Sequence, residues 1–189
     1  VRDVNKDGKI NADDRTIIGN YQPDFTWGMT NNFSYKGFEL SIMLSGSQGG
    51  EIMNQQARFT KIFNNNRNAY KSVANFWRSD ENPGDGSTFK PRVVQNTVQA
   101  QSSTYWVEDG SFVRIKNIRL GYNFPSSILR KCRLTNLKLY VNMENIHVFS
   151  DYPNFDPESN TYQSGYLVGY DYGAYPNPFT ATVGINLSF

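Results

Sequence analysis

Cysteine and histidine are almost missing from this sequence of 189 residues, which contains one of each. The single Cys132 excludes an internal disulfide, and the single His147 excludes both a multi-histidine metal site and an ordinary Ser-His-Asp triad. An excess of one charge is also lacking, because 19 basic residues stand against 17 acidic ones and the basic residues are scattered. We therefore expect neither an enzyme nor a nucleic-acid-binding protein.

Long hydrophobic runs are lacking as well. No stretch of 18 apolar residues occurs, so the sequence predicts no transmembrane helix. The chain begins at Val1 with neither a methionine nor a signal peptide, and we expect it to be a piece of a longer protein. Aromatic residues are abundant instead, with 12 Tyr and 13 Phe, which favours β-sheets over helical bundles.

Alternating apolar and polar side chains predict five strands. The alternating segments are residues 24–35, 38–45, 112–124, 136–149 and 179–189. Only Lys36 and Gly37 separate the first two, which predicts a tight hairpin. The alternation shifts phase near Asn117, as at a β-bulge or at the rim of a membrane. The last segment alternates over its whole length, which matches the roughly 9–11 residues that a tilted strand needs to cross a bilayer. The pattern predicts an all-β protein, with residues 24–189 forming strands and loops of an antiparallel transmembrane barrel.

The connections between these strands alternate in length. The hairpin and the link at residues 125–135 are short, whereas residues 46–111 and 150–178 are long. Outer-membrane barrels alternate short periplasmic turns with long extracellular loops. If Phe189 lies on the periplasmic side, both long segments face outward. Within the first of them, residues 67–78 have apolar side chains at helical spacing, which predicts a short helix.

Residues 1–23, expected to be an extracellular loop, contain an acidic motif that fits a calcium-binding loop of the EF-hand or dockerin type. Calcium prefers many oxygen ligands, and a twelve-residue loop with a glycine at its sharp turn, here Gly8, supplies them. Asp stands at the last ligand position in place of the usual Glu. The alternative is an acidic surface turn without metal. The expected ligands of a structural Ca²⁺ are Asp3, Asn5, Asp7, the Lys9 carbonyl, Asn11 and Asp14.

The second long segment holds half of the tyrosines. A tyrosine cluster is suited to stacking on a sugar or to packing against a partner protein. The alternative is an aromatic girdle with self-packing of the loop. The candidate ligand or lid contacts are Tyr152, Tyr162, Tyr166, Tyr170, Tyr172 and Tyr175.

Several motifs in order along the chain resemble one family. Residues 3–52 contain RTIIG, PDFTWG and YKGFEL, and further similar stretches follow at 76–83, 107–125, 137–158 and 175–189. These motifs resemble the C-terminal part of TonB-dependent outer-membrane transporters of the SusC/RagA type. The likeness covers nearly the whole chain.

The resemblance implies about five closing strands of a plugged barrel of about 22 strands in the outer membrane of a Gram-negative bacterium, in contact with lipid. It implies import of glycans or peptides with a SusD-like surface lipoprotein, powered through a TonB complex that contacts an N-terminal part outside this sequence. It also implies that the barrel assembly machinery reads a C-terminal signal. The residues that match this signal are Thr182, Gly184, Leu187 and Phe189.

Two other classes of protein share some of these features. A secreted, calcium-stabilised β-sandwich that binds carbohydrate would also have the calcium motif, the tyrosines and the strands, but would not need a final strand of bilayer length. A dockerin-like adhesion module would need a second calcium loop, and the sequence has only one. Dependence on detergent distinguishes the barrel from both.

Overall fold

The structure is a computed structural model, and it describes residues 2–61, 68–85, 88, 102–158, 161 and 168–189. The chain divides into two compact units. The helices in the described part of the chain all lack the length and hydropathy that a membrane-crossing helix requires. The strand unit consists of residues 22–50, 109–159 and 175–189, and the loop unit of residues 1–21, 51–108 and 160–174.

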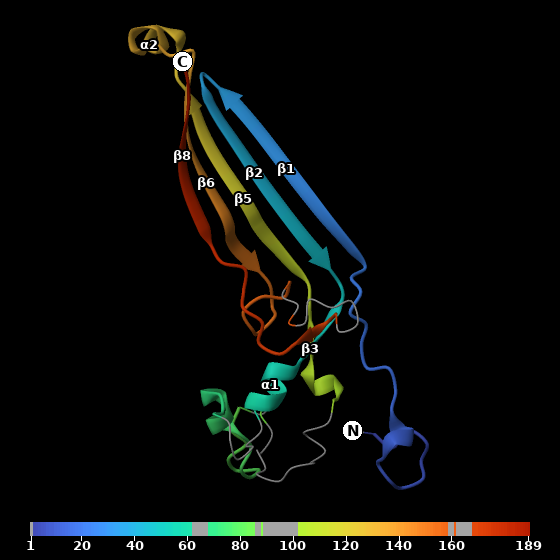
Figure 1. Ribbon diagram of the computed structural model, residues 1–189. Coiled ribbons are helices and arrows are strands. Elements are labelled where there is room, and N and C mark those ends of the chain that lie inside the picture. The colour runs from blue at the N-terminus through green and yellow to red at the C-terminus, as the bar shows by residue number, and fades with distance from the viewer. Residues whose placement is uncertain (1, 62–67, 86–87, 89–101, 159–160, 162–167) are drawn as a thin grey trace. The chain divides into compact units, whose positions relative to one another are not determined.

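The strand unit is built on one antiparallel sheet of five long strands in the order β1-β2-β5-β6-β8 (Figure 1). All five predicted strands are confirmed. The largest difference in their bounds is at β2, which continues to Gln48, whereas the alternation ends at residue 45. The strands are β1 (Phe25–Tyr35), β2 (Phe38–Gln48), β5 (Phe112–Asn123), β6 (Asn136–Phe149) and β8 (Thr180–Ser188).

The turn and the irregularities of the sheet follow from local sequence. Lys36 and Gly37 both have positive φ angles, 45° and 92°, as a two-residue hairpin requires. The phase shift near Asn117 is a β-bulge, because the register of β2 against β5 shifts next to Met43. A second shift lies between β5 and β6, where Asn145 has a φ of 51°. The bulges keep apolar side chains on one face although the sequence changes phase.

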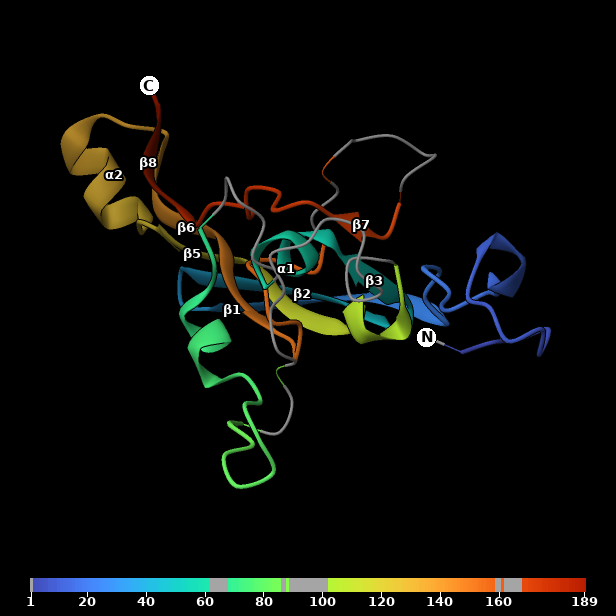
Figure 2. The same cartoon turned by 90° about the horizontal axis from the view of Figure 1, so that it is seen from below.

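The short connections and the C-terminus lie at one end of the sheet (Figure 1, Figure 2). The link between β5 and β6 contains a helix, α2 (Ser126–Cys132), which follows Pro125 and ends at Arg133 in the left-handed conformation. The backbone N–H of Thr135 then donates to the carbonyl of Ser188 at the end of β8, at 2.8 Å. The link is short, as expected, but it is folded into a helix that the strand pattern does not predict.

The loop unit has a small sheet of order β4-β3-β7, from β3 (Glu51–Asn54), β4 (Val107–Asp109) and β7 (Tyr170–Asp171). Helix α1 (Gln55–Thr60) follows β3 directly, and the Asn54 side chain caps it by accepting from the Ala57 N–H at 2.8 Å. Met53, Ala57 and Trp106 form the core, against which Ile18, Val107 and Tyr170 pack. Short 3-10 helices occur at Ala12–Asp14, Lys71–Asn75 and Thr104–Trp106.

The helix predicted over residues 67–78 is only partly present. Within its described residues the chain forms one 3-10 segment, Lys71–Asn75, and continues in an extended conformation from Phe76. The Trp77 N–H donates to the Thr88 carbonyl, and the Asn75 carbonyl accepts from the Asp85 N–H. The helix ends early because these bonds pair the chain with the following bend.

Candidate functional site

Candidate barrel wall and loop pocket

The two faces of the five-stranded sheet differ in chemistry. Strand pairing aligns apolar side chains in a row that crosses all five strands, and this face is largely exposed, with Phe33 at 59% and Val183 at 78%. An exposed apolar surface of this extent on a soluble monomer would be unusual. The row consists of Phe33, Leu40, Leu120, Val141 and Val183.

The opposite face carries the polar partners. The neighbouring row on that face consists of Asn32, Ser41, Arg119, Asn142 and Thr182. On the same face, Glu39 accepts hydrogen bonds from Asn123, at 2.7 Å, and from Lys138. Glu39 and Lys138 border a hollow of about 400 Å³. The sheet therefore has the two-sided chemistry of a wall between an apolar and an aqueous phase.

The residues of the expected assembly signal occupy different environments. Thr182 lies on the polar face opposite Asn142, and Leu187 lies on the apolar face opposite Leu137. Gly184 faces Tyr140, and Phe189 follows the end of β8 and is 90% exposed. A Cβ added at Gly184 would lie 2.3 Å from Tyr140 Cζ, so the glycine leaves room for this ring.

A buried ion pair ties the second long segment to β5. Arg114 Nη2 donates to Asp156 Oδ1 at 2.5 Å, and both side chains are buried. Asp156 also accepts from the backbone N–H of Glu158, and from the backbone N–H and side-chain amide of Asn177. One carboxylate thus connects both ends of residues 150–178 to the sheet. Sequence spacing gives no signal for this pair, because 42 positions separate its members.

The acidic motif of the loop unit folds into a tight turn that directs its carboxylates to its own backbone. Asp3 accepts from the N–H groups of Lys6, at 2.6 Å, and Gly8, at 2.8 Å. Asp7 accepts from the N–H of Lys9 at 2.8 Å. Lys6 and Gly8 have φ angles of 63° and 81°, which bend the chain around these side chains.

Asp14 closes this turn from its other end. Its carboxylate accepts from the backbone N–H groups of Asn11, Val4 and Asn5, which lower its pKa below the usual value. Within the described residues, no three His, Cys, Asp or Glu side chains converge on one point. Only three of the six expected calcium ligands are carboxylates. The other three are the Asn5 side chain, the Lys9 carbonyl and the Asn11 side chain.

The four described tyrosines of the expected contact set have different roles. Tyr152 is buried in the strand unit, and Tyr170 packs against the core of the loop unit. The Tyr172 ring lies 6.0 Å from the Phe59 ring, whereas Tyr175 is 86% exposed. Tyr162 and Tyr166 lie outside the described residues. Tyr175 is therefore the most accessible of the four for a ligand or partner.

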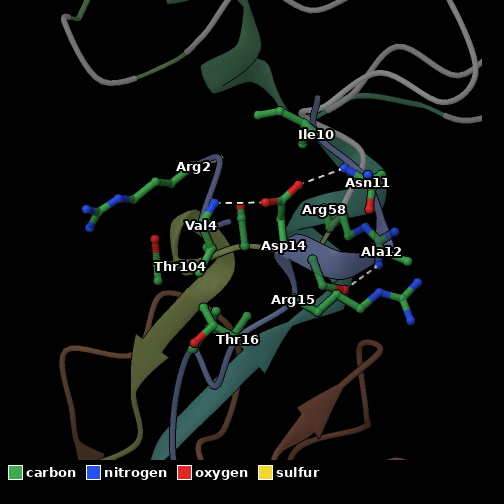
Figure 3. A pocket seen from close by; sticks show the side chains of 13 residues that line it. Arg2, Val4, Ile10, Asn11, Ala12, Asp14, Arg15, Thr16, Arg58 and Thr104 are labelled. Carbon is green, nitrogen blue, oxygen red and sulfur yellow. Dashed lines mark hydrogen bonds between the residues drawn. The ribbon is translucent and has the colours of Figure 1, made fainter. Parts of the chain in front are cut away.

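The loop unit also contains a pocket of about 1010 Å³ that the sequence does not predict (Figure 3). The turn around Asp14 forms one side of it, and Arg58 of α1 and residues 102–104 also line it. Arg2 and Arg15 contribute two further guanidinium groups. The sequence gives little indication of this pocket, because Arg58 lies far along the chain from Arg2 and Arg15 and no motif joins the three.

Comparisons with known proteins

No family model matches the chain. Over 192 residues it is 37% identical to TonB-dependent receptor P3 of Formosa agariphila, covering 99% of this chain and 18% of that protein. Over 196 residues it is 26% identical to TonB-dependent receptor SusC of Bacteroides thetaiotaomicron, covering 99% of this chain and 17% of that protein. The chain spans less than a fifth of the length of these relatives.

Among solved structures, the RagAB peptide importer in its open-open state is similar, with a TM-score of 0.77 and 27% identity. The similarity covers 96% of this chain and 19% of that chain. Both the order of the motifs and the fold therefore agree with one group of proteins. The chain belongs to the SusC/RagA family of TonB-dependent receptors, and its five-stranded sheet is part of their β-barrel.

Proposed function

We propose that this chain forms part of the wall of an outer-membrane transporter that imports a glycan or a peptide. The observation that carries the proposal is the two-faced sheet, in which strands of 9 to 14 residues expose one apolar and one polar face. Strands of this length cross a bilayer when tilted. In such a wall the apolar face contacts lipid and the polar face lines the lumen.

The transporter would work with other proteins. The relatives are TonB-dependent receptors, which supports energy coupling through a TonB complex. Similarity to SusC and to the RagAB importer supports a SusD-like surface lipoprotein as the partner. The long segments would face this lipoprotein and the ligand, and the barrel assembly machinery would insert the protein. The named cargo of RagAB is a peptide, whereas exposed Tyr175 suits a sugar equally well.

Cell fractionation and uptake assays test the proposal on the full-length protein that contains this chain. The protein should appear in the outer membrane of a Gram-negative host, should require detergent for extraction, and should migrate differently in gels when unheated. Deleting its gene should abolish uptake of one labelled class, either oligosaccharides or short peptides. A full-length protein that stays soluble without detergent would instead favour the secreted β-sandwich.

We also propose that residues 3–14 bind one structural Ca²⁺. Asp3, Asp7 and Asp14 lie within one short, tightly bent turn, and the spacing of its oxygen-bearing side chains supports a site for a hard cation. The ion would be held at oxygen distances of about 2.3–2.6 Å. Its role would be to keep the loop ordered, since the motif supplies oxygen ligands but no base beside them to activate a water.

Trypsin cleavage at Lys6 and Lys9 measures this order. Chelation of calcium should speed cleavage at both residues in the full-length protein, and Asp7→Ala should do so even with calcium present. Asp13→Asn serves as the control, because it removes a charge from the same turn and Asp13 is not an expected calcium ligand. If a chelator leaves the cleavage rate of the unmodified protein unchanged, the motif is a metal-free turn.

A further inference from the structure

The pocket in the loop unit is positively charged. Three guanidinium groups, those of Arg2, Arg15 and Arg58, and one carboxylate, that of Asp14, are the charged groups among its described lining residues. The Asp14 carboxylate already accepts from three backbone N–H groups, so it is turned toward its own loop. The charge available to a bound molecule is therefore cationic.

The arginines are arranged on two sides of this space. Figure 3 shows the side chains of Arg15 and Arg58 extending toward one side of the pocket and that of Arg2 toward the opposite side. Arg58 is held in place, because its Nη1 donates to Gln55 Oε1 at 3.0 Å and to Ser102 Oγ at 3.3 Å. A guanidinium fixed in this way loses little freedom when it binds an anion.

The other polar side chains that line the pocket are the amide of Asn11 and the hydroxyls of Thr16, Ser102, Ser103 and Thr104. Hydroxyls donate hydrogen bonds to anionic oxygens as readily as they accept them from a sugar or an amide. Arginine binds planar carboxylates through two parallel hydrogen bonds. Guanidinium groups beside hydroxyl donors therefore fit a carboxylate group on a polar ligand.

We propose that this pocket binds a carboxylate group of the ligand that the transporter imports. The inference rests on the proposed function, which it makes more specific. The carboxylate has two possible sources, the uronic acid of an oligosaccharide and the C-terminus of a peptide. The pocket recognises the chemistry that both share, and the choice between the two sources is left to the rest of the binding site.

Calorimetry on the full-length protein in detergent, with calcium present throughout, tests the proposal. The probes form two pairs, each of an acid and its counterpart without the carboxylate. The first pair is trigalacturonate and galactotriose, and the second is trialanine and trialanine with an amidated C-terminus. We expect one of the two acids to bind and its neutral counterpart to bind about tenfold more weakly, as the loss of a charge-assisted hydrogen bond predicts. The acid that binds identifies the source of the carboxylate. Equal affinity for acid and neutral forms, or no binding of either acid, would overturn the proposal.

Variants that remove one positive charge test whether the acid binds in this pocket. Arg15→Gln and Arg58→Gln should each weaken binding of the acid about tenfold and leave binding of the neutral probe unchanged. Arg15 is exposed, so its variant remains informative even if the Arg58 variant fails to assemble. Lys36→Gln, in the hairpin of the strand unit, is the control. Wild-type affinity for the acid in both arginine variants would refute the carboxylate site in this pocket. It would not refute the proposed transporter, which outer-membrane location and detergent dependence test separately.

Discussion

Gly184 illustrates how one small residue serves the packing of the sheet. The Tyr140 ring lies against it, and the Arg119 guanidinium lies 4.6 Å from the centre of that ring. Even a methyl group at this position would displace the ring. The sequence pattern assigns Gly184 to an assembly signal, whereas the register of β6 and β8 supplies a steric reason for the same glycine.

We expect Gly184→Ala to lower the unfolding free energy of the full-length barrel by about 1–3 kcal/mol through overpacking. Urea unfolding in detergent measures this cost. Gly28→Ala is the matched control, because the nearest atom to its added Cβ lies at 3.9 Å. In a Tyr140→Ala background the cost should largely disappear. A cost that persists there would show that the glycine is needed for something other than room for the ring.

Asp156 is the second residue on which local order depends. Asp156→Ala would leave the buried Arg114 guanidinium with only the partly exposed Glu158 carboxylate, 3.0 Å from its Nε. We therefore expect a loss of stability below the roughly 3–5 kcal/mol that a buried charge without any partner costs. We expect faster proteolysis within residues 150–158 and a lower urea midpoint. Asp151→Ala, at an exposed position of the same segment, should change neither. An unchanged midpoint in the Asp156 variant would mean that the ion pair does not anchor the segment.

Among the elements, β8 offers the clearest test of which face meets lipid. Ile185 faces Leu139 on the apolar side, and Asn186 faces Lys138 on the polar side. Ile185→Arg should cost roughly 2–4 kcal/mol near the middle of the membrane, whereas Asn186→Arg should be tolerated in an aqueous lumen. Unfolding from lipid vesicles gives both values. Equal costs at the two positions would favour a soluble sheet with two covered faces.

The end of β8 carries the prediction about assembly. Phe189 is almost fully exposed, so its removal takes little packing from the described structure. If the terminal aromatic is read by the assembly machinery, its deletion from the full-length protein should still lower the outer-membrane level strongly. Ser188→Ala, which leaves the backbone pairing of β8 with β6 intact, should not. Normal levels after the deletion would make Phe189 a packing residue only.

The strands were predictable because their side chains alternate over many residues, and this signal does not depend on neighbours in space. The pocket and the Arg114–Asp156 pair were not, since each joins segments far apart in the sequence. The helix predicted over residues 67–78 shortened because tertiary hydrogen bonds at Asn75 and Trp77 outweigh a weak local preference. Local periodicity thus determines the wall, and long-range contacts determine the loops.

For the molecule as a whole, the orientation of the sheet can be tested on intact cells. Lys71 and Arg78 belong to the first long segment, whereas Lys36 and Arg133 belong to the two short connections. If the long segments face outward, trypsin added to cells should cleave at Lys71 or Arg78. Lys36 and Arg133 should be cleaved only after the outer membrane is opened. The reverse pattern would invert the topology.

The sequences of the two outer strands of the sheet have a consequence for association with other chains. Within the described residues, β1 and β8 each pair with one neighbour, and neither FTWGMTNNFSY nor TATVGINLS contains a proline or a charged residue. Soluble sheets usually protect their outermost strands with such residues, and unprotected ones recruit other chains into fibrils. In the proposed transporter, β1 and β8 would therefore remain open to pairing with other chains until their neighbours in the barrel pair with them. Avoiding aggregation would then depend on how quickly each of these two strands pairs with its neighbour in the barrel.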